Sequence, residues 1–147
     1  MGGHDAMNWM LALHLVVLAM GTGMSFSNLV NFALAARLPA EQARLLAGLR
    51  MVMGRIGDGV IALIWLSGLF LAAGMGGGAG MDAFPVAFHV KMLFVLLLTL
   101  SHIGARYSAS RAAKGGGAVW IMRARLFTAG VFLSAVASIV LAVLAFR

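Results

Sequence analysis

The chain has 147 residues, of which 63% are hydrophobic and 10% charged, and its formal net charge is +7. Charged residues are too scarce to cover the surface of a water-soluble domain of this length. The composition therefore excludes a water-soluble domain. Cysteine is absent, which excludes disulfides, thiolate metal sites and covalently attached c-type haem.

Four long stretches contain no Asp, Glu, Lys or Arg: residues 6–36, 59–81, 92–105 and 126–146. A helix needs about 20 apolar residues to cross the hydrocarbon core. The stretches lack the period of two that strands of a membrane barrel show. We therefore predict an all-α fold, a single transmembrane domain with helices at about 8–35, 56–74, 83–107 and 119–146. The short links favour an antiparallel four-helix bundle.

Segments between the predicted spans carry their own signals. Residues 39–52 have helical spacing with a basic face and are expected to lead into the second helix. The glycine-rich segment 74–80 is expected to form an external turn. Pro85 is expected in the first turn of the third helix, where proline is tolerated.

The basic residues gather in two of the three links. Arg37, Arg44, Arg50 and Arg55 lie between the first two helices, and Arg106, Arg111, Lys114, Arg123 and Arg125 between the last two. Under the positive-inside rule both links are cytoplasmic, and the N- and C-termini lie outside, in the periplasm. The prediction is a multi-pass protein of the bacterial inner (plasma) membrane. Its positive charge serves topology and contacts with anionic lipid rather than nucleic acid.

Polar residues inside a bilayer are costly, so each is a candidate for function. In the first helix, His14 shares one helical face with Gly21, Ser25 and Asn28. Small and polar residues on one face are expected to pack against other helices rather than lipid. His14 is therefore either a ligand or a helix-packing residue.

The third helix carries His89, Lys91 and His102. Lys91 and His102 are eleven residues apart and lie close to one face, whereas His89 and Lys91 point to nearly opposite faces. We therefore expect His14 to meet His89 or Lys91, and not both equally well. His89 is a ligand or lies at the lipid headgroups. Lys91 neutralises a propionate, coordinates iron or extends to the interface. His102 is structural or a ligand.

Methionines raise copper as a rival to iron. Met7, Met10, Met75 and Met81, together with His4, are predicted on the outer side, and thioether ligands suit Cu(I). Methionine is also a common filler of apolar helices, which is the alternative explanation.

Several motifs together resemble a known family. The helix-one run 9–14, which ends in His14, the segment 53–56 leading to 66–71, and the pattern His89-x-Lys91-x10-His102 resemble the HemJ-type protoporphyrinogen IX oxidases. These are small four-helix membrane proteins within a broader CopD-like family. The resemblance covers most of the chain through about residue 107. The aromatic-rich stretch and Pro-Arg pair that the family usually has after its histidine are replaced here by residues 21–26.

The resemblance implies a haem b protein that oxidises protoporphyrinogen IX to protoporphyrin IX and passes electrons to quinone or another carrier. It implies that His14 is the family's functional histidine and Lys91 its functional, catalytic lysine. We expect non-covalent haem b with His14 and His89 as iron ligands and with Lys91, Ser25 and Asn28 beside the cofactor. Expected partners are the lipid bilayer, a porphyrin or quinone, and a second copy or a larger membrane complex.

Two alternatives stay open. One is a haem-containing electron carrier or accessory subunit of a membrane complex that performs no catalysis. The other is CopD-like copper handling by the outer histidine and methionines.

Overall fold

The computed structural model describes residues 3–76 and 84–145, and all regular structure in these ranges is α-helical. The helices are α1 (Gly3–Ala35), α2 (Ala40–Gly76), α3 (Val86–Ala113) and α4 (Gly117–Ala145). The predicted all-α fold with four helices is confirmed.

Each helix contains a stretch long and apolar enough to cross a membrane: Asp5–Ala35, Ala40–Gly74, Val86–Ala113 and Gly117–Leu141. Large apolar side chains on their outer faces lie uncovered. Leu66 of α2, Leu100 of α3 and Leu133 of α4 are 65%, 63% and 65% exposed. A continuous apolar exterior of this kind indicates contact with lipid, and the chain is a multi-pass membrane protein.

Helix boundaries differ from the predicted ones at several ends. Residues 40–55 belong to α2, which is one uninterrupted helix because Ala, Glu, Gln, Arg and Leu there are strong helix formers. Pro85 is the N-cap of α3 rather than part of its first turn, with φ −63° and ψ 155°. Residues 74–76, predicted as the start of an external turn, belong to α2. The remaining predicted turn residues 77–80 and the predicted helix ends at 83 and 146 lie outside the described residues.

The link between α3 and α4 is closed by glycines. The N–H of Lys114, the C-cap of α3, bonds to carbonyl oxygens of Ala112 and Ser110. Gly115 and Gly117 adopt φ values of 90° and 73°, which favour glycine because a side chain would clash there. This tight turn lets α4 return directly along α3.

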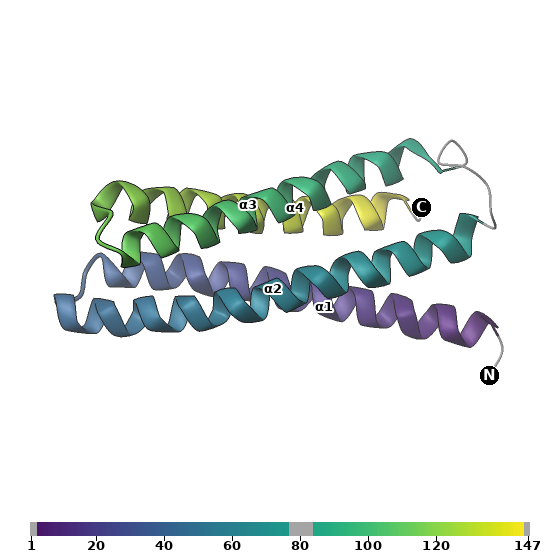
Figure 1. Cartoon of the computed structure of the whole chain (residues 1–147). Coiled ribbons are helices and arrows are strands. Elements are labelled where there is room, and N and C mark those ends of the chain that lie inside the picture. Colours follow the sequence, from purple (N-terminus) through teal and green to yellow (C-terminus); the bar gives the residue numbers. More distant parts are fainter. Residues whose placement is uncertain (1–2, 77–83, 146–147) are drawn as a thin grey trace.

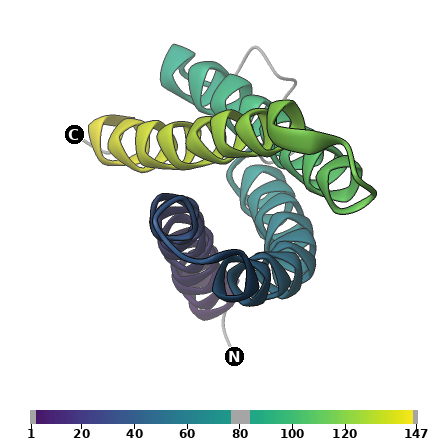
Figure 2. The same ribbon diagram turned by 90° about the vertical axis from the view of Figure 1, so that its left-hand side faces the viewer.

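The helices pair as two hairpins, α1 with α2 and α3 with α4, which cross at an angle (Figures 1 and 2). The first residues of α1 and the last of α4 lie at one end of the molecule, and the short links 36–39 and 114–116 at the other (Figure 1). We call the latter the basic end, because it carries most of the arginines. Between the hairpins, α1 packs on α4, whereas α2 and α3 are only sparsely packed on each other.

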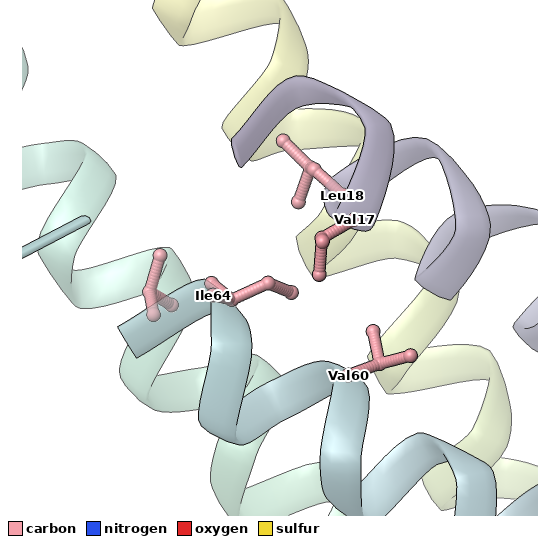
Figure 3. Close-up of a cluster of buried hydrophobic side chains, with 5 residues drawn as sticks. Val17, Leu18, Val60 and Ile64 are labelled. Carbon is pink, nitrogen blue, oxygen red and sulfur yellow. The ribbon is translucent and has the colours of Figure 1, made fainter. Parts of the chain in front are cut away.

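The apolar core between the hairpins is small. Val17 and Leu18 of α1 meet Val60 and Ile64 of α2, and Val95 of α3 completes this cluster (Figure 3). A second cluster joins Leu98 of α3 to two buried residues of α4, Val131 and Ala135. Both clusters lie near the middle of the bundle. Towards its ends, polar side chains connect the helices instead.

Small residues bring α3 and α4 together. A Cβ added to Gly104 would lie 2.7 Å from the Phe127 ring, and one added to Gly130 would lie 2.8 Å from Ser101 Oγ. Ser108 and Ser138 are completely or almost completely buried. Close approach through small residues is the usual way helices associate where burial in lipid offers no hydrophobic gain.

Candidate functional site

His14 is held inside the bundle by a serine of α2. Its side chain is 4% exposed, and its Nδ1 lies 2.7 Å from Ser67 Oγ. The Ser67 hydroxyl donates to the carbonyl of Leu63, 2.5 Å away, so Ser67 Oγ accepts the hydrogen bond from Nδ1–H of His14. This tautomer leaves Nε2 as a lone-pair donor, and Nε2 makes no hydrogen bond within the described residues.

Lys91 of α3 is a charged residue that acts electrostatically on the His14 imidazole. It is partly buried and close enough to His14 for the two groups to interact electrostatically. His89, two residues earlier, is exposed, and its Nδ1 lies 3.3 Å from the carbonyl oxygen of Pro85. A hydrogen bond joins His14 to Ser67, and Lys91 acts electrostatically on the same imidazole; we call these three residues the outer site. The hydrogen bond of His89 goes to the Pro85 backbone instead.

A second polar cluster joins the hairpins towards the basic end. His102 Nε2 of α3 lies 2.7 Å from Asp58 Oδ1 of α2, and Arg106 Nη2 lies 3.2 Å from Asp58 Oδ2. Asp58 thus uses both carboxylate oxygens to bind two groups of the other hairpin. We call Asp58, His102 and Arg106 the Asp58 cluster.

Two glycines of α2 make room for this cluster. A Cβ added to Gly57 would lie 2.8 Å from His102 Cε1, and one added to Gly54 would lie 2.8 Å from Arg106 Nη1. The two side chains of α3 therefore lie directly on the backbone of α2. Sequence reasoning missed this cluster. The available signal was an aspartate at the edge of an apolar span, one residue after a glycine.

A cavity of about 740 Å³ lies between all four helices at the basic end. Five of its lining residues are permanent cations, and no Asp or Glu lines it; the cations are Arg44, Arg50, Arg55, Arg106 and Lys114. The remaining wall mixes small residues with apolar ones such as Phe32, Met51 and Ile121. We call it the basic cavity.

The predicted cofactor-binding residues Ser25 and Asn28 line this cavity rather than the outer site. Ser25 is buried, and its Oγ donates to the carbonyl of Gly21, 2.8 Å away. Asn28 Oδ1 is buried without a hydrogen-bond partner among the described residues. The polar face that begins with His14 therefore lies inside the bundle, as its composition predicts, but it serves two separate places.

The described side chains contain no group of three or more His, Cys, Asp or Glu that could hold a metal ion. Of the predicted copper residues, Met7 lies against α2, where a Cβ on Gly74 would meet its Sδ at 2.9 Å. Met10 is partly buried. The side chains of His4, Met75 and Met81 lie outside the described residues, so copper binding by this set stays a prediction.

Comparison with protein-family models, curated proteins and solved structures gives no match to this chain. Inferences about function therefore depend on the chemistry of the residues.

Proposed function

We propose that the helices form an antiparallel bundle in a plasma membrane, with the basic end in the cytoplasm and both termini outside. The support is the concentration of arginines at the end that holds the links 36–39 and 114–116. This orientation places the outer site towards the external face and the basic cavity at the cytoplasmic face.

We further propose that the outer site binds haem b and that the protein is an oxidoreductase. One observation carries this proposal: a buried imidazole whose Nδ1–H is held by Ser67, whose Nε2 has no hydrogen bond among the described residues, and on which Lys91 acts electrostatically. Histidines that ligate metals characteristically donate their other ring N–H to a fixed acceptor, which sets the tautomer and the ring orientation. The donor set fits the group, since His14 Nε2 would be available to hold the iron.

Each residue of the outer site would have a distinct task. His14 would hold the iron, Ser67 would fix the imidazole ring, and the Lys91 ammonium would bind a carboxylate of the macrocycle or of a substrate. Neither His14 nor Lys91 lines the basic cavity. A macrocycle would enter where α2 and α3 are sparsely packed. Haem bound there would supply one-electron redox chemistry, and the protein would supply position and charge.

The substrate we propose is a porphyrinogen, in line with the resemblance of the first three helices to protoporphyrinogen IX oxidases. Electrons would leave to quinone or another carrier. A haem-bearing electron carrier without a porphyrinogen site is the alternative with the same outer site. Complementation of a bacterial strain that lacks protoporphyrinogen oxidase separates the two: growth supports the enzyme, and failure with full haem loading supports the carrier. We expect Lys91→Ala to abolish complementation while the protein still accumulates in the membrane.

The haem proposal is tested by the absorption spectrum of the purified protein. We expect a Soret band and b-type reduced peaks, lost in His14→Ala and retained in His89→Ala. Ser67→Ala should weaken haem binding by about 10- to 100-fold, because it frees the ring that the serine orients. Circular dichroism confirms that each variant is folded. A folded His14→Ala protein with full haem would refute the assignment.

A further inference from the structure

The basic cavity concentrates positive charge inside the bundle. Of its five cations, Arg106 alone forms an ion pair among the described residues, with Asp58. Arg44, Arg50, Arg55 and Lys114 have no acidic partner there. Four like charges around one chamber between low-dielectric walls attract a counter-anion strongly, because field lines are focused into the chamber.

Arg50 is the cation best placed to bind such an anion. It is partly buried, its guanidinium carbon stacks 4.3 Å from the centre of the Phe32 ring, and its Nη1 lies 3.4 Å from the backbone oxygen of Asn31. These contacts fix the planar group and use only one of its five N–H donors. A fixed guanidinium fork binds phosphate or carboxylate through two parallel hydrogen bonds.

The inner part of the cavity is less polar than its mouth. A void of about 50 Å³ continues it towards the middle of the bundle, and Ser25, Asn28, Gly54, His102 and Val131 line both spaces. Apolar side chains surround the far side of the void: Leu18, Val60, Ile61, Ile64 and Leu98. Asn28 lies where the two spaces meet, and its Oδ1 has no hydrogen-bond partner among the described residues. A donor on a bound ligand would remove the cost of this buried, unpaired oxygen.

We propose that the basic cavity is a binding site for an amphiphile with a phosphate or carboxylate head. The head binds at Arg50 among the cations of the mouth. The apolar part lies along Phe32, Met51, Ile121 and Val131, and a hydroxyl or amide of the ligand donates to Asn28. A volume of about 740 Å³ suits a ligand of this kind, since small-molecule pockets span about 300–1,000 Å³. This site is independent of haem binding at the outer site.

Dodecyl phosphate is a suitable probe for the test. The full-length protein is placed in nanodiscs of neutral phosphatidylcholine, and binding of radiolabelled dodecyl phosphate is measured by equilibrium dialysis. We expect saturable binding of one molecule per chain, with no competition from dodecyl maltoside, which has the same tail and no charge. Binding that does not saturate, or that dodecyl maltoside displaces equally, overturns the proposal.

Two variants locate the site. Arg50→Gln should weaken binding at least about tenfold, the effect of losing a charged hydrogen-bonding partner. Arg125→Gln is its matched control, because it removes the same charge from an exposed position that does not line the cavity. Equal weakening by both variants would mean attraction to a basic surface only and would overturn the site.

Ala109→Phe tests the space without changing a charge. Ala109 lines the cavity and is exposed, so a larger side chain enters the chamber without disturbing the core. We expect weaker binding than in Ala118→Phe, an exposed position of α4 outside the lining. Unchanged binding in Ala109→Phe would contradict occupation of the chamber.

The source of the ligand is read from native mass spectrometry of protein taken directly from membranes. One anionic lipid per chain, lost in Arg50→Gln and kept in Arg125→Gln, identifies a membrane lipid as the ligand. A lipid-free chain that still binds dodecyl phosphate identifies a cytoplasmic amphiphile. An anionic lipid retained equally by both variants contradicts the assignment to the basic cavity.

Discussion

His14 and His102 are both held by a side chain of α2 at 2.7 Å, but their partners differ. His14 donates to a neutral hydroxyl that also bonds to its own helix, and its Nε2 makes no hydrogen bond within residues 3–76 and 84–145. His102 bonds to the carboxylate of Asp58, which also pairs with Arg106. The two side chains of α3 therefore share one acidic partner. The two histidines of one bundle are therefore held in different ways. The outer site keeps a lone pair available, whereas the Asp58 cluster uses its polar groups to join two sparsely packed helices.

The largest effect that would sharpen this contrast is expected for Gly57→Ala. The new Cβ would lie 2.8 Å from His102 Cε1, so the imidazole, which Asp58 holds by a hydrogen bond, must shift. Overpacking of this kind typically costs about 1–3 kcal/mol. Thermal unfolding in detergent, followed by tryptophan fluorescence, measures the loss.

Gly59→Ala is the matched control for this variant, because an added Cβ there has nothing within 4 Å. Both variants gain the same helix propensity, so their difference isolates the contact with His102. Equal stability of the two proteins would show that His102 does not lie on the α2 backbone.

A smaller loss is expected from Asp58→Asn, which keeps the shape of the side chain and removes its charge. Arg106 then loses its counter-charge, and His102 loses a charged hydrogen-bond partner. Because the Asp58 side chain is 50% exposed, the cost is reduced by solvent to about 1 kcal/mol. Unfolding measurements on Asp58→Asn, Arg106→Gln and the double variant give the coupling energy between the two side chains. A coupling energy of zero would remove Asp58 as a connection between the hairpins.

Ser67→Ala is expected to lower stability by about 0.6 kcal/mol, the average for a hydrogen bond between membrane helices. Ser138→Ala serves as the control, since the Ser138 hydroxyl, among the described residues, bonds to a carbonyl of its own helix alone. A loss in Ser67→Ala no greater than in Ser138→Ala would indicate that the bond to His14 contributes nothing to stability.

Sequence reasoning reached the four helices because each apolar stretch is a local property of the chain. It also placed His14, Ser25 and Asn28 on an inward face, because that face follows from 3.6 residues per turn. It left open whether His89 or Lys91 meets His14, since the rotation of α3 depends on packing against α4. The contact of His14 with Ser67 was not predicted, because serines in membrane helices commonly bond to their own helix, and Ser67 also does so.

The Asp58 cluster escaped prediction for a related reason. Its formation depends on the register between α2 and α3, which come from different hairpins and whose backbones approach closely at few positions. Gly54 and Gly57 carry no chemistry of their own, so their importance emerges only when the side chains lying on them are known. The basic cavity likewise requires all four helices in place before its arginines are seen to face one chamber.

The smallest effect is expected at Gly68, the glycine beside His14. A Cβ there would lie 3.4 Å from His14 Cε1, which is ordinary van der Waals contact, and alanine also favours the helix. We therefore expect Gly68→Ala to change stability by less than about 0.5 kcal/mol in the same unfolding assay. A loss of stability as large as that of Gly57→Ala would show that the His14 imidazole packs on α2 as tightly as His102 does. The contrast between His14 and His102 would then fail, because both rings would be packed equally tightly against α2.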